Sequence, residues 1–303
     1  MGARREILKR IIIPLLIALA LTSQASAQQM PHGQGVLWQI QTPSGGKTNF
    51  LFGTMHSTDP GITTLPEPVK QAFARAGSLT VEVVATKDMP VRMARRMMLP
   101  PRQSLDQIAG AALFKQFAAV GRRMGYPLAT LRRLKPWAAS AAISFPPEER
   151  AGQAAGRLPL DQALQRAATK RGIPVFGLES IDEQLNLMDG LSVGDQIKLL
   201  RQAVEDSAHV SQLVATMKKF YLARDISGLF TWMRRQAAGQ DPRLMQIFQD
   251  RMINARNRLM AGRMIARLKA GGAFVAVGAA HLPGKRGILS LLVRQGYRIS
   301  RVY

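Results

Sequence analysis

Residues 50–56 read Phe-Leu-Phe-Gly-Thr-Met-His, and a matching stretch, Phe-Val-Ala-Val-Gly-Ala-Ala-His, stands at residues 274–281. In each stretch an apolar run precedes Gly-x-x-His, which is typical of a strand buried on both faces that ends in a tight turn or a close contact at the glycine. In open α/β sheets, ligands bind beyond the carboxyl ends of parallel strands. We therefore expect His56 and His281 to meet at that edge of a sheet, despite their separation in the sequence.

The small number of histidines makes their positions informative. Only four occur in 303 residues, and a single Gly-x-x-His is also compatible with a structural histidine at a strand end. Two copies at the ends of two apolar runs favour a functional pair. His32, in a polar segment, and His209, in a long helical pattern, are expected to be solvated or packed.

The remaining hydrophobic patterns predict an α/β fold. Apolar runs bounded by Gly and Pro indicate strands at residues 36–41, 48–53, 78–84, 174–179, 273–277 and 297–302. Amphipathic patterns lie between several of them, so we expect a mixed, largely parallel central sheet flanked by helices. A large inserted helical region is predicted at about residues 88–158, where prolines and glycines separate helical segments; residues 145–158 are expected to form a loop or a lid.

The first 27 residues resemble a secretory signal peptide. Basic residues precede an apolar block at residues 11–21, and Ala-Ser-Ala follows at residues 25–27. The block is shorter than the roughly twenty residues that a spanning helix requires, so we expect cleavage after Ala27 and no transmembrane span thereafter; retention as an anchor is the alternative. Residues 28–303 would then form a single α/β domain in the periplasm or outside the cell.

The composition limits the possible chemistry and partners. The chain has no cysteine, which excludes a thiol nucleophile and cysteine ligands to zinc. Its formal net charge is +23, which favours an anionic partner such as polysaccharide, lipid head groups or an acidic substrate, although solvated arginines on helix faces would give the same balance. Nucleic acid is not expected as a partner because no aromatic-interleaved basic motif is present in the sequence. Phosphate-binding loops and a Gly-x-Ser-x-Gly elbow are also absent from the sequence.

Two carboxylates are predicted on buried strands, Glu82 and Glu179. Burial of a carboxylate is costly unless it is paired or ligating, so each requires a partner. A salt bridge to one of the many arginines is the simplest partner. Arg256, near the middle of a long helix that begins at Asp241-Pro242, is a candidate to hold either glutamate or to bind a substrate carboxylate.

Two mechanisms are compatible with these residues. Two histidines and a carboxylate are a ligand set known from divalent metal sites, where the ion acidifies a water molecule and polarises a carbonyl. Alternatively, without a metal, one histidine acts as general base on water while a glutamate orients it or serves as acid. The sequence does not choose between them.

These residues, taken in order, resemble the TraB/GumN family, which is grouped with the Tiki proteases and erythromycin esterases in a distant superfamily. The likeness extends from Leu37-Trp38 to Val302. Besides the two histidine stretches, its carriers are Leu65-Pro66, Val81-Glu82-Val83, Lys135-Pro136-Trp137, Leu160-Asp161, Gly177-Leu178-Glu179-Ser180, Gln184, Arg256-Asn257 and Leu282-Pro283-Gly284. Each is weak alone, and their order makes the resemblance specific.

The resemblance implies an α/β core with an inserted helical region. The Tiki branch implies metal-dependent peptide hydrolysis, with His56, His281 and Glu82 as the ligands of manganese, cobalt or zinc. The GumN branch takes its name from an exopolysaccharide gene cluster, so hydrolysis there is an inference. Lys285-Arg286 departs from the acidic residues expected before Gly287, and the added positive charge disfavours a bound cation.

We therefore expect an exported metal-dependent hydrolase of peptide or other amide bonds, with His56, Glu82, His281, Glu179 and Arg256 in its site. The first alternative is a non-catalytic basic envelope protein that binds anionic polysaccharide or lipid. The second is a metal-free, esterase-like hydrolase.

Overall fold

The computed structural model describes residues 30–303, and the predicted signal peptide, residues 1–27, lies outside the described residues. The chain divides into two compact units. The helical unit consists of Thr86–Arg157 and Ile181–Thr216, and the sheet unit consists of residues 30–85, Leu158–Ser180 and Met217–Tyr303. The helical unit therefore includes a second segment beyond the insertion predicted at about residues 88–158.

A six-stranded sheet with the order β4-β3-β5-β2-β1-β6 forms the centre of the sheet unit. Its strands are β1 (Leu37–Gln41), β2 (Asn49–Thr54), β3 (Ser78–Val81), β4 (Val175–Gly177), β5 (Ala273–Gly278) and β6 (Arg298–Arg301). The strands β4, β3, β5 and β2 are parallel, while β1 pairs antiparallel with both β2 and β6. The predicted mixed, largely parallel sheet is thus confirmed, and β1 and β2 form a hairpin.

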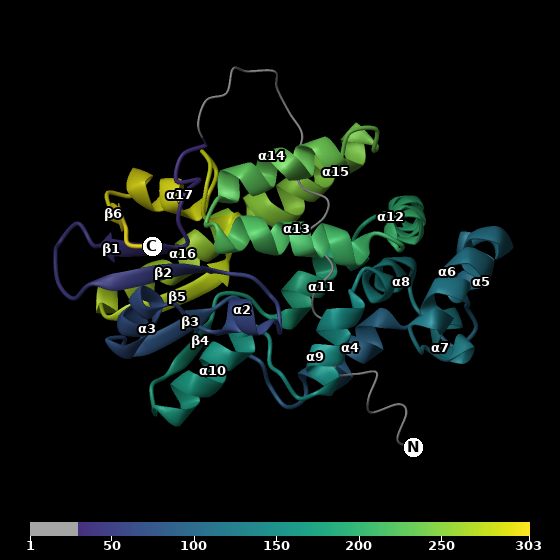
Figure 1. Ribbon diagram of the computed structural model, residues 1–303, viewed down its shortest axis with the longest axis horizontal. Coiled ribbons are helices and arrows are strands. Elements are labelled where there is room, and N and C mark those ends of the chain that lie inside the picture. The colour runs from purple at the N-terminus through teal and green to yellow at the C-terminus, as the bar shows by residue number, and fades with distance from the viewer. Residues whose placement is uncertain (1–29) are drawn as a thin grey trace. The chain divides into compact units, whose positions relative to one another are not determined.

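Helices cover both faces of this sheet (Figure 1). They are α2 (Pro60–Thr63), α3 (Glu67–Ala74), α10 (Leu160–Lys170), the end of α13 (Val210–Leu222), α14 (Ile226–Gln236), α15 (Pro242–Phe248), α16 (Arg256–Ala270) and α17 (Ile288–Arg294). Successive side chains of β5 point to opposite faces of the sheet. On one face Phe274 contacts Phe52 of β2 and Phe73 of α3. The neighbouring Val275 belongs to the hydrophobic core on the other face, with Met260, Met264 and Leu268 of α16.

The helical unit contains α4 (Met89–Met97), α5 (Leu105–Ala109), α6 (Ala111–Arg123), α7 (Leu128–Arg132), α8 (Pro136–Ile143), α9 (Pro147–Ala154), α11 (Ile181–Asp189), α12 (Val193–Asp206) and the start of α13. The prediction of a loop at residues 145–158 was wrong for its central part, which forms α9. Two prolines do not prevent this helix because Pro146 is its N-cap and Pro147 its first residue, where a missing N–H is harmless.

Lys135-Pro136-Trp137 has a structural role in the helical unit. Lys135 Nζ lies 2.7 Å from Asp189 Oδ1, and Trp137 Nε1 donates to the same oxygen at 3.0 Å. Arg96 Nη2 donates to Asp189 Oδ2 at 3.2 Å. Asp189 is the last residue of α11, so these contacts join the start of α8 to α4 and to the end of α11.

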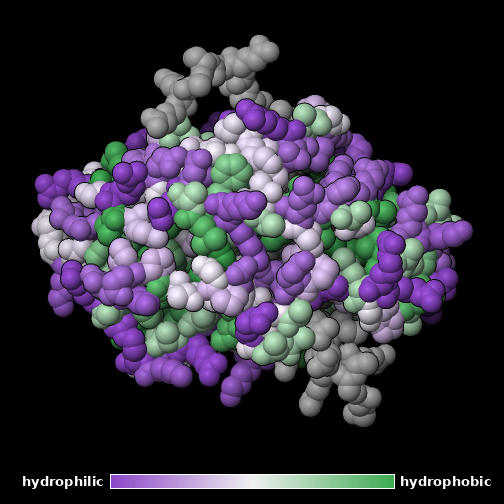
Figure 2. Space-filling view, in the orientation of Figure 1, coloured by the Kyte–Doolittle hydropathy of each residue, from purple (hydrophilic) through white to green (hydrophobic). Residues whose placement is uncertain are grey.

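The face of the molecule seen in Figure 2 is predominantly polar. Figure 2 shows hydrophilic residues over most of the visible face, with smaller hydrophobic areas between them. Of the helices in residues 30–303, none combines the length and apolar composition needed to cross a bilayer.

Candidate active site

The predicted site residues follow directly after the parallel strands. His56 comes two residues after β2, Glu82 one residue after β3, Glu179 two residues after β4, and His281 three residues after β5. Because these strands are parallel, their carboxyl ends share one edge of the sheet. The prediction that the glutamates lie within strands was wrong by one or two residues, since β3 ends at Val81 and β4 at Gly177.

The two glycines of the Gly-x-x-His stretches are required by close packing. A Cβ atom at Gly53 would lie 2.7 Å from Leu282 Cδ1 and 2.9 Å from Ala279 Cα, in the turn that carries His281. A Cβ atom at Gly278 would lie 3.3 Å from Glu82 Oε1. Gly53 therefore lets the end of β2 approach the turn at residues 279–282, which carries His281. Gly278 lets the Glu82 carboxylate approach the end of β5.

The Arg256 guanidinium is the centre of the site. Its Nε donates to both oxygens of Glu179, at 3.0 and 3.1 Å. Its Nη2 donates to Glu179 Oε2 at 2.7 Å and to Glu82 Oε2 at 2.5 Å. The side chains of Arg256, Glu82 and Glu179 are 11%, 7% and 2% exposed, so this arginine is the shared ion-pair partner of two buried carboxylates.

A π-helical turn precedes Arg256. Residues Gln249–Ala255 form this turn between α15 and α16, and Arg256 Nη1 lies 3.4 Å from the carbonyl oxygen of Met252 within it. The helix predicted from Asp241-Pro242 is thus continuous but wider in its middle. Such turns occur often at functional sites because they change the direction of the side chains that follow.

His281 is held as a neutral imidazole. Its Nε2 lies 3.1 Å from Arg256 Nη1, and its Nδ1 lies 2.7 Å from Asn257 Oδ1. The guanidinium can only donate, so Nε2 accepts and Nδ1 carries the proton that Asn257 accepts. Burial and the charge of Arg256 lower the pKa of His281 to about 3, so the ring stays neutral at ordinary pH.

Glu82 is held as a carboxylate. Burial alone would raise its pKa, but the charge of Arg256, together with the two histidines and the Gly278 N–H, outweighs burial and holds the pKa well below its usual range. The backbone N–H of Gly278 also donates to Glu82 Oε1, at 2.6 Å. The same oxygen lies 3.8 Å from His281 Nε2. The carboxylate is therefore ionised and fixed in position from β5.

Asp161 orients His56 in this site. The carboxylate Oδ2 lies 2.5 Å from His56 Nδ1, and Thr54 Oγ1 donates to Oδ1 at 2.7 Å. Asp161 is the second residue of α10, whose first N–H, that of Leu160, donates to the Ser57 carbonyl at 3.1 Å. This contact fixes α10 against the chain that carries His56. Within residues 30–303, Nδ1 is the only ring nitrogen of His56 with a hydrogen bond.

The pKa of His56 is raised. Burial lowers it, but the charge and hydrogen bond of Asp161, aided by the charge of Glu82, raise it to about 9. The side chain of His56 is 26% exposed. Glu82 and Arg256 both act on the His56 charge, which places this histidine beside the buried cluster although no hydrogen bond joins them.

All five predicted residues lie at this edge of the sheet. Glu82, Glu179, His281 and Arg256 are joined by direct contacts, whereas His56 is joined to Asp161. The roles of Asp161 and Asn257 were not predicted. Both residues stand in stretches that carry the family resemblance, Leu160-Asp161 and Arg256-Asn257, but the sequence did not indicate that either contacts a histidine.

The predicted ligand set does not fit a metal ion in this arrangement. No group of three or more His, Cys, Asp or Glu residues arranged to hold an ion occurs in residues 30–303. Arg256 donates to Glu82 Oε2 and to His281 Nε2, two of the atoms that would have to bind the ion. The metal therefore stays a prediction, and no step below depends on it.

Comparisons with known proteins identify the family. No curated protein and no solved structure was found to match. A model of the TraB/PrgY/gumN family matches residues 36–301, which include the entire sheet, the His56–Asp161 pair and the Arg256 cluster. The chain belongs to the TraB/PrgY/gumN family.

Proposed function

We propose that this protein hydrolyses peptide or other amide bonds, with His56 as the group that transfers protons. The observation that carries the proposal is the His56–Asp161 pair. Asp161 binds Nδ1, the second ring nitrogen has no hydrogen bond within residues 30–303, and the side chain of His56 is 26% exposed. A carboxylate on Nδ1 fixes the ring and leaves a lone pair on Nε2 when the ring is neutral. Histidine–carboxylate pairs in hydrolases use this arrangement to activate water.

The proton transfers can be assigned to named atoms. His56 Nε2 removes a proton from water while the water oxygen attacks the carbonyl carbon. The imidazolium formed is stabilised by Asp161 and Glu82, the two acids that raise the pKa of His56. Nε2 then returns the proton to the leaving nitrogen as the C–N bond breaks, which gives a carboxylic acid and an amine.

Arg256 and His281 are positioning residues in this proposal. All the N–H groups of Arg256 face Glu179, Glu82, His281 or the Met252 carbonyl. None is therefore available to a substrate without rearrangement. Their role is to hold Glu82 ionised beside His56.

The test is hydrolysis of a fluorogenic peptide library by the purified protein and by His56→Asn and His56→Gln variants. We expect both variants to lose activity by about 100-fold or more, the usual contribution of a general base, with unchanged circular dichroism. Equal activity of wild type and both variants would contradict the assignment.

Metal dependence is tested in the same assay. Activity that survives dialysis against EDTA is expected if the described residues act alone. Loss of activity with EDTA, and its recovery with manganese, cobalt or zinc, would instead support the metal-dependent hydrolase that the family resemblance predicts. In that case Arg256 would have to move away from Glu82 and His281.

The second candidate is a binding protein for anionic polysaccharide or lipid. The net charge of +23 favours it. Its sign would be binding that weakens steeply with salt and is unaffected by His56→Asn. The enzyme proposal predicts instead that His56→Asn abolishes hydrolysis.

Export is part of the proposal as well. Amino-terminal sequencing of the protein from the periplasmic fraction of a bacterial host is expected to begin at Gln28. Recovery of the protein in the cytoplasm, with residue 1 intact, would contradict export.

A further inference from the structure

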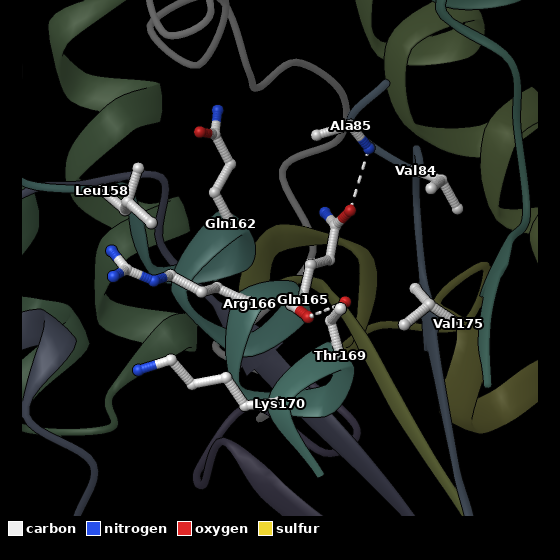
Figure 3. Close-up of a pocket in the computed structure, with 9 residues that line it drawn as sticks. All are labelled: Val84, Ala85, Leu158, Gln162, Gln165, Arg166, Thr169, Lys170 and Val175. Carbon is white, nitrogen blue, oxygen red and sulfur yellow. Dashed lines mark hydrogen bonds between the residues drawn. The ribbon is translucent and has the colours of Figure 1, made fainter. Parts of the chain in front are cut away.

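A second feature of the sheet unit lies beside the proposed active site. It is a cavity of about 500 Å³ between α10, the chain that follows β3 and the edge strand β4 (Figure 3). Its lining consists of Val84, Ala85, Leu158, Gln162, Gln165, Arg166, Thr169, Lys170 and Val175. We call this cavity the α10 pocket.

One face of α10 supplies most of the lining. Gln162, Gln165, Arg166, Thr169 and Lys170 follow the spacing i, i+3, i+4, i+7 and i+8, which places them on one side of the helix. The opposite side, with Leu160, Leu164 and Ala168, is buried in the core. Apart from Gln165, the pocket side chains of α10 therefore lie away from the face that packs on the sheet.

The charge of the α10 pocket is positive and uncompensated. Arg166 and Lys170 extend from α10 to the same side in Figure 3, and both are exposed. Neither forms an ion pair in the part of the chain that the structure describes, and no acidic residue is in the lining. Elsewhere in the sheet unit, by contrast, basic side chains such as Lys218 pair with a carboxylate.

The strand β4 has an open edge. Parallel pairing with β3 uses the Pro174 carbonyl, which accepts from Leu79, and the Leu178 N–H, which donates to the Val81 carbonyl. In a parallel ladder the intervening Val175 and Gly177 direct their N–H and C=O groups away from β3. Among the described residues these groups have no backbone partner, and such an edge is a template for an added strand.

Gln165 already binds backbone in this pocket. Its Oε1 accepts from the Ala85 N–H at 2.8 Å, and its Nε2 donates to the Val83 carbonyl at 3.2 Å. The chain after β3 is thus held in place by a side-chain amide (Figure 3). Val84 and Val175 are the apolar part of the lining on the Gln165 side of α10, while Arg166 and Lys170 extend to its other side (Figure 3).

The α10 pocket is adjacent to the proposed active site along the chain. Val84 and Ala85 come two and three residues after Glu82, and α10 begins at the residue before Asp161. At about 1.5 Å per residue, Lys170 lies roughly 14 Å along the helix from Asp161. An extended peptide covers this distance in about four residues.

We propose that the α10 pocket binds an extended acidic segment of a peptide substrate, whose backbone pairs with β4 and whose carboxylates contact Arg166 and Lys170. The inference rests on the proposed function in naming its substrate class. The outward N–H and C=O groups of β4 alternate at the spacing of a peptide backbone. A polysaccharide has no N–H and C=O groups at that regular spacing. Val84 and Val175 offer an apolar contact to a side chain of the bound peptide that stands between two acidic residues.

The experiment measures binding by fluorescence anisotropy, with His56→Asn used to prevent hydrolysis. The probes are labelled eight-residue peptides that alternate Val with either Glu or Gln. We expect the Glu peptide to bind more tightly than the Gln peptide. In the Arg166→Gln/Lys170→Gln variant the Glu peptide should bind about threefold to tenfold more weakly, because each exposed ion pair contributes little.

A matched variant controls for net charge. Lys219→Gln/Lys269→Gln removes two exposed charges that do not line the pocket, and we expect it to leave binding unchanged. Equal weakening by both double variants would overturn the proposal, because it would reflect the overall charge of the protein. Equal binding of the Glu and Gln peptides would overturn it too.

N-methylated peptides test the strand pairing. Methylation of alternate amides on one edge of the Glu peptide should abolish binding, whereas methylation on the other edge should not. Binding that survives both patterns, or pocket-dependent binding of polygalacturonate without binding of the peptide, would contradict an added strand. Hydrolysis is measured separately with wild-type protein, so failure of the pocket and failure of the proposed function give different results.

Discussion

At the scale of single residues, the site consists of one accessible histidine and one buried one with opposite shifts of pKa. His56 is raised to about 9 because Asp161 and Glu82 outweigh burial, and His281 is lowered to about 3 because burial and Arg256 act together. The neighbours rather than the residue type therefore decide the charge. This difference assigns proton transfer to His56 and a fixed neutral role to His281.

Asp161→Asn is expected to lower the pKa of His56 well below 9, since it removes the largest influence that raises it. A general base must be neutral, so kcat/KM of the wild type should rise with pH up to about 9. In the variant the rise should occur at lower pH, with a smaller maximum because the ring is less well oriented. Thr54→Val removes one hydrogen bond to Asp161 but retains its charge, and should leave the inflection near 9. An unshifted profile in Asp161→Asn would contradict the pairing.

Arg256→Ala is expected to lower the free energy of unfolding by about 3–5 kcal/mol, because two buried carboxylates lose their partner. Urea denaturation measures this change. Arg286→Ala is the matched control, since its ion pair with Asp250 is long and exposed, at 3.5 Å; it should change the stability little. Similar midpoints for the two variants would show that the Arg256 cluster does not stabilise the fold.

At the scale of elements, the strand ends determine which residues meet. Gly53→Ala would introduce a Cβ atom 2.7 Å from Leu282 Cδ1, and we expect a loss of about 1–3 kcal/mol in stability from overpacking. Activity should fall as well, since the displaced turn carries His281. Gly262→Ala, in α16 with nothing within 4 Å of its Cβ position, should instead stabilise by about 0.5–1 kcal/mol. Thermal unfolding of the two variants distinguishes close packing from a general intolerance of alanine.

The elements were largely predictable from the sequence because β2 and β5 are continuous apolar runs that end in glycine. The ends of β3 and β4 were less predictable. The hydrophobic pattern of each strand continues through Glu82 and Glu179, although β3 ends at Val81 and β4 at Gly177. The π-helical turn at Gln249–Ala255 has no signal in the composition. The pairing of His56 with Asp161 depends on where α10 starts relative to β2, which is a tertiary contact across about a hundred residues.

At the scale of the whole molecule, acid is expected to destabilise the fold. His281 has a pKa of about 3 when folded and 6.5 as a free side chain, so protons favour the unfolded chain as the pH falls from 6.5 to 3. Glu82 has a lowered pKa, and its contribution is present above 4.5 and is lost as the pH falls further. Urea titrations at a series of pH values should show this loss, and His281→Asn should reduce its dependence on pH between 6.5 and 4.5.

Above pH 6.5 the stability of the fold is expected to fall as the pH rises. The pKa of His56 is higher in the folded protein than in the unfolded chain, so its contribution is full below 6.5 and disappears as the pH rises through 9. Stability should therefore decline between these values in the wild type. Asp161→Asn should remove most of that decline, and an identical decline in the variant would contradict the assignment.

The most direct test of the account is an NMR titration of the protein with ¹⁵N-labelled histidine. The chain has only four histidines, so the ring signals can be assigned by substituting each in turn. We predict that His56 titrates near pH 9 and that His281 remains neutral, with its proton on Nδ1, down to about pH 3. Titration of both rings near the ordinary value of 6.5 would show that neither the Asp161 pair nor the Arg256 cluster exists in solution, and would remove the basis for assigning proton transfer to His56.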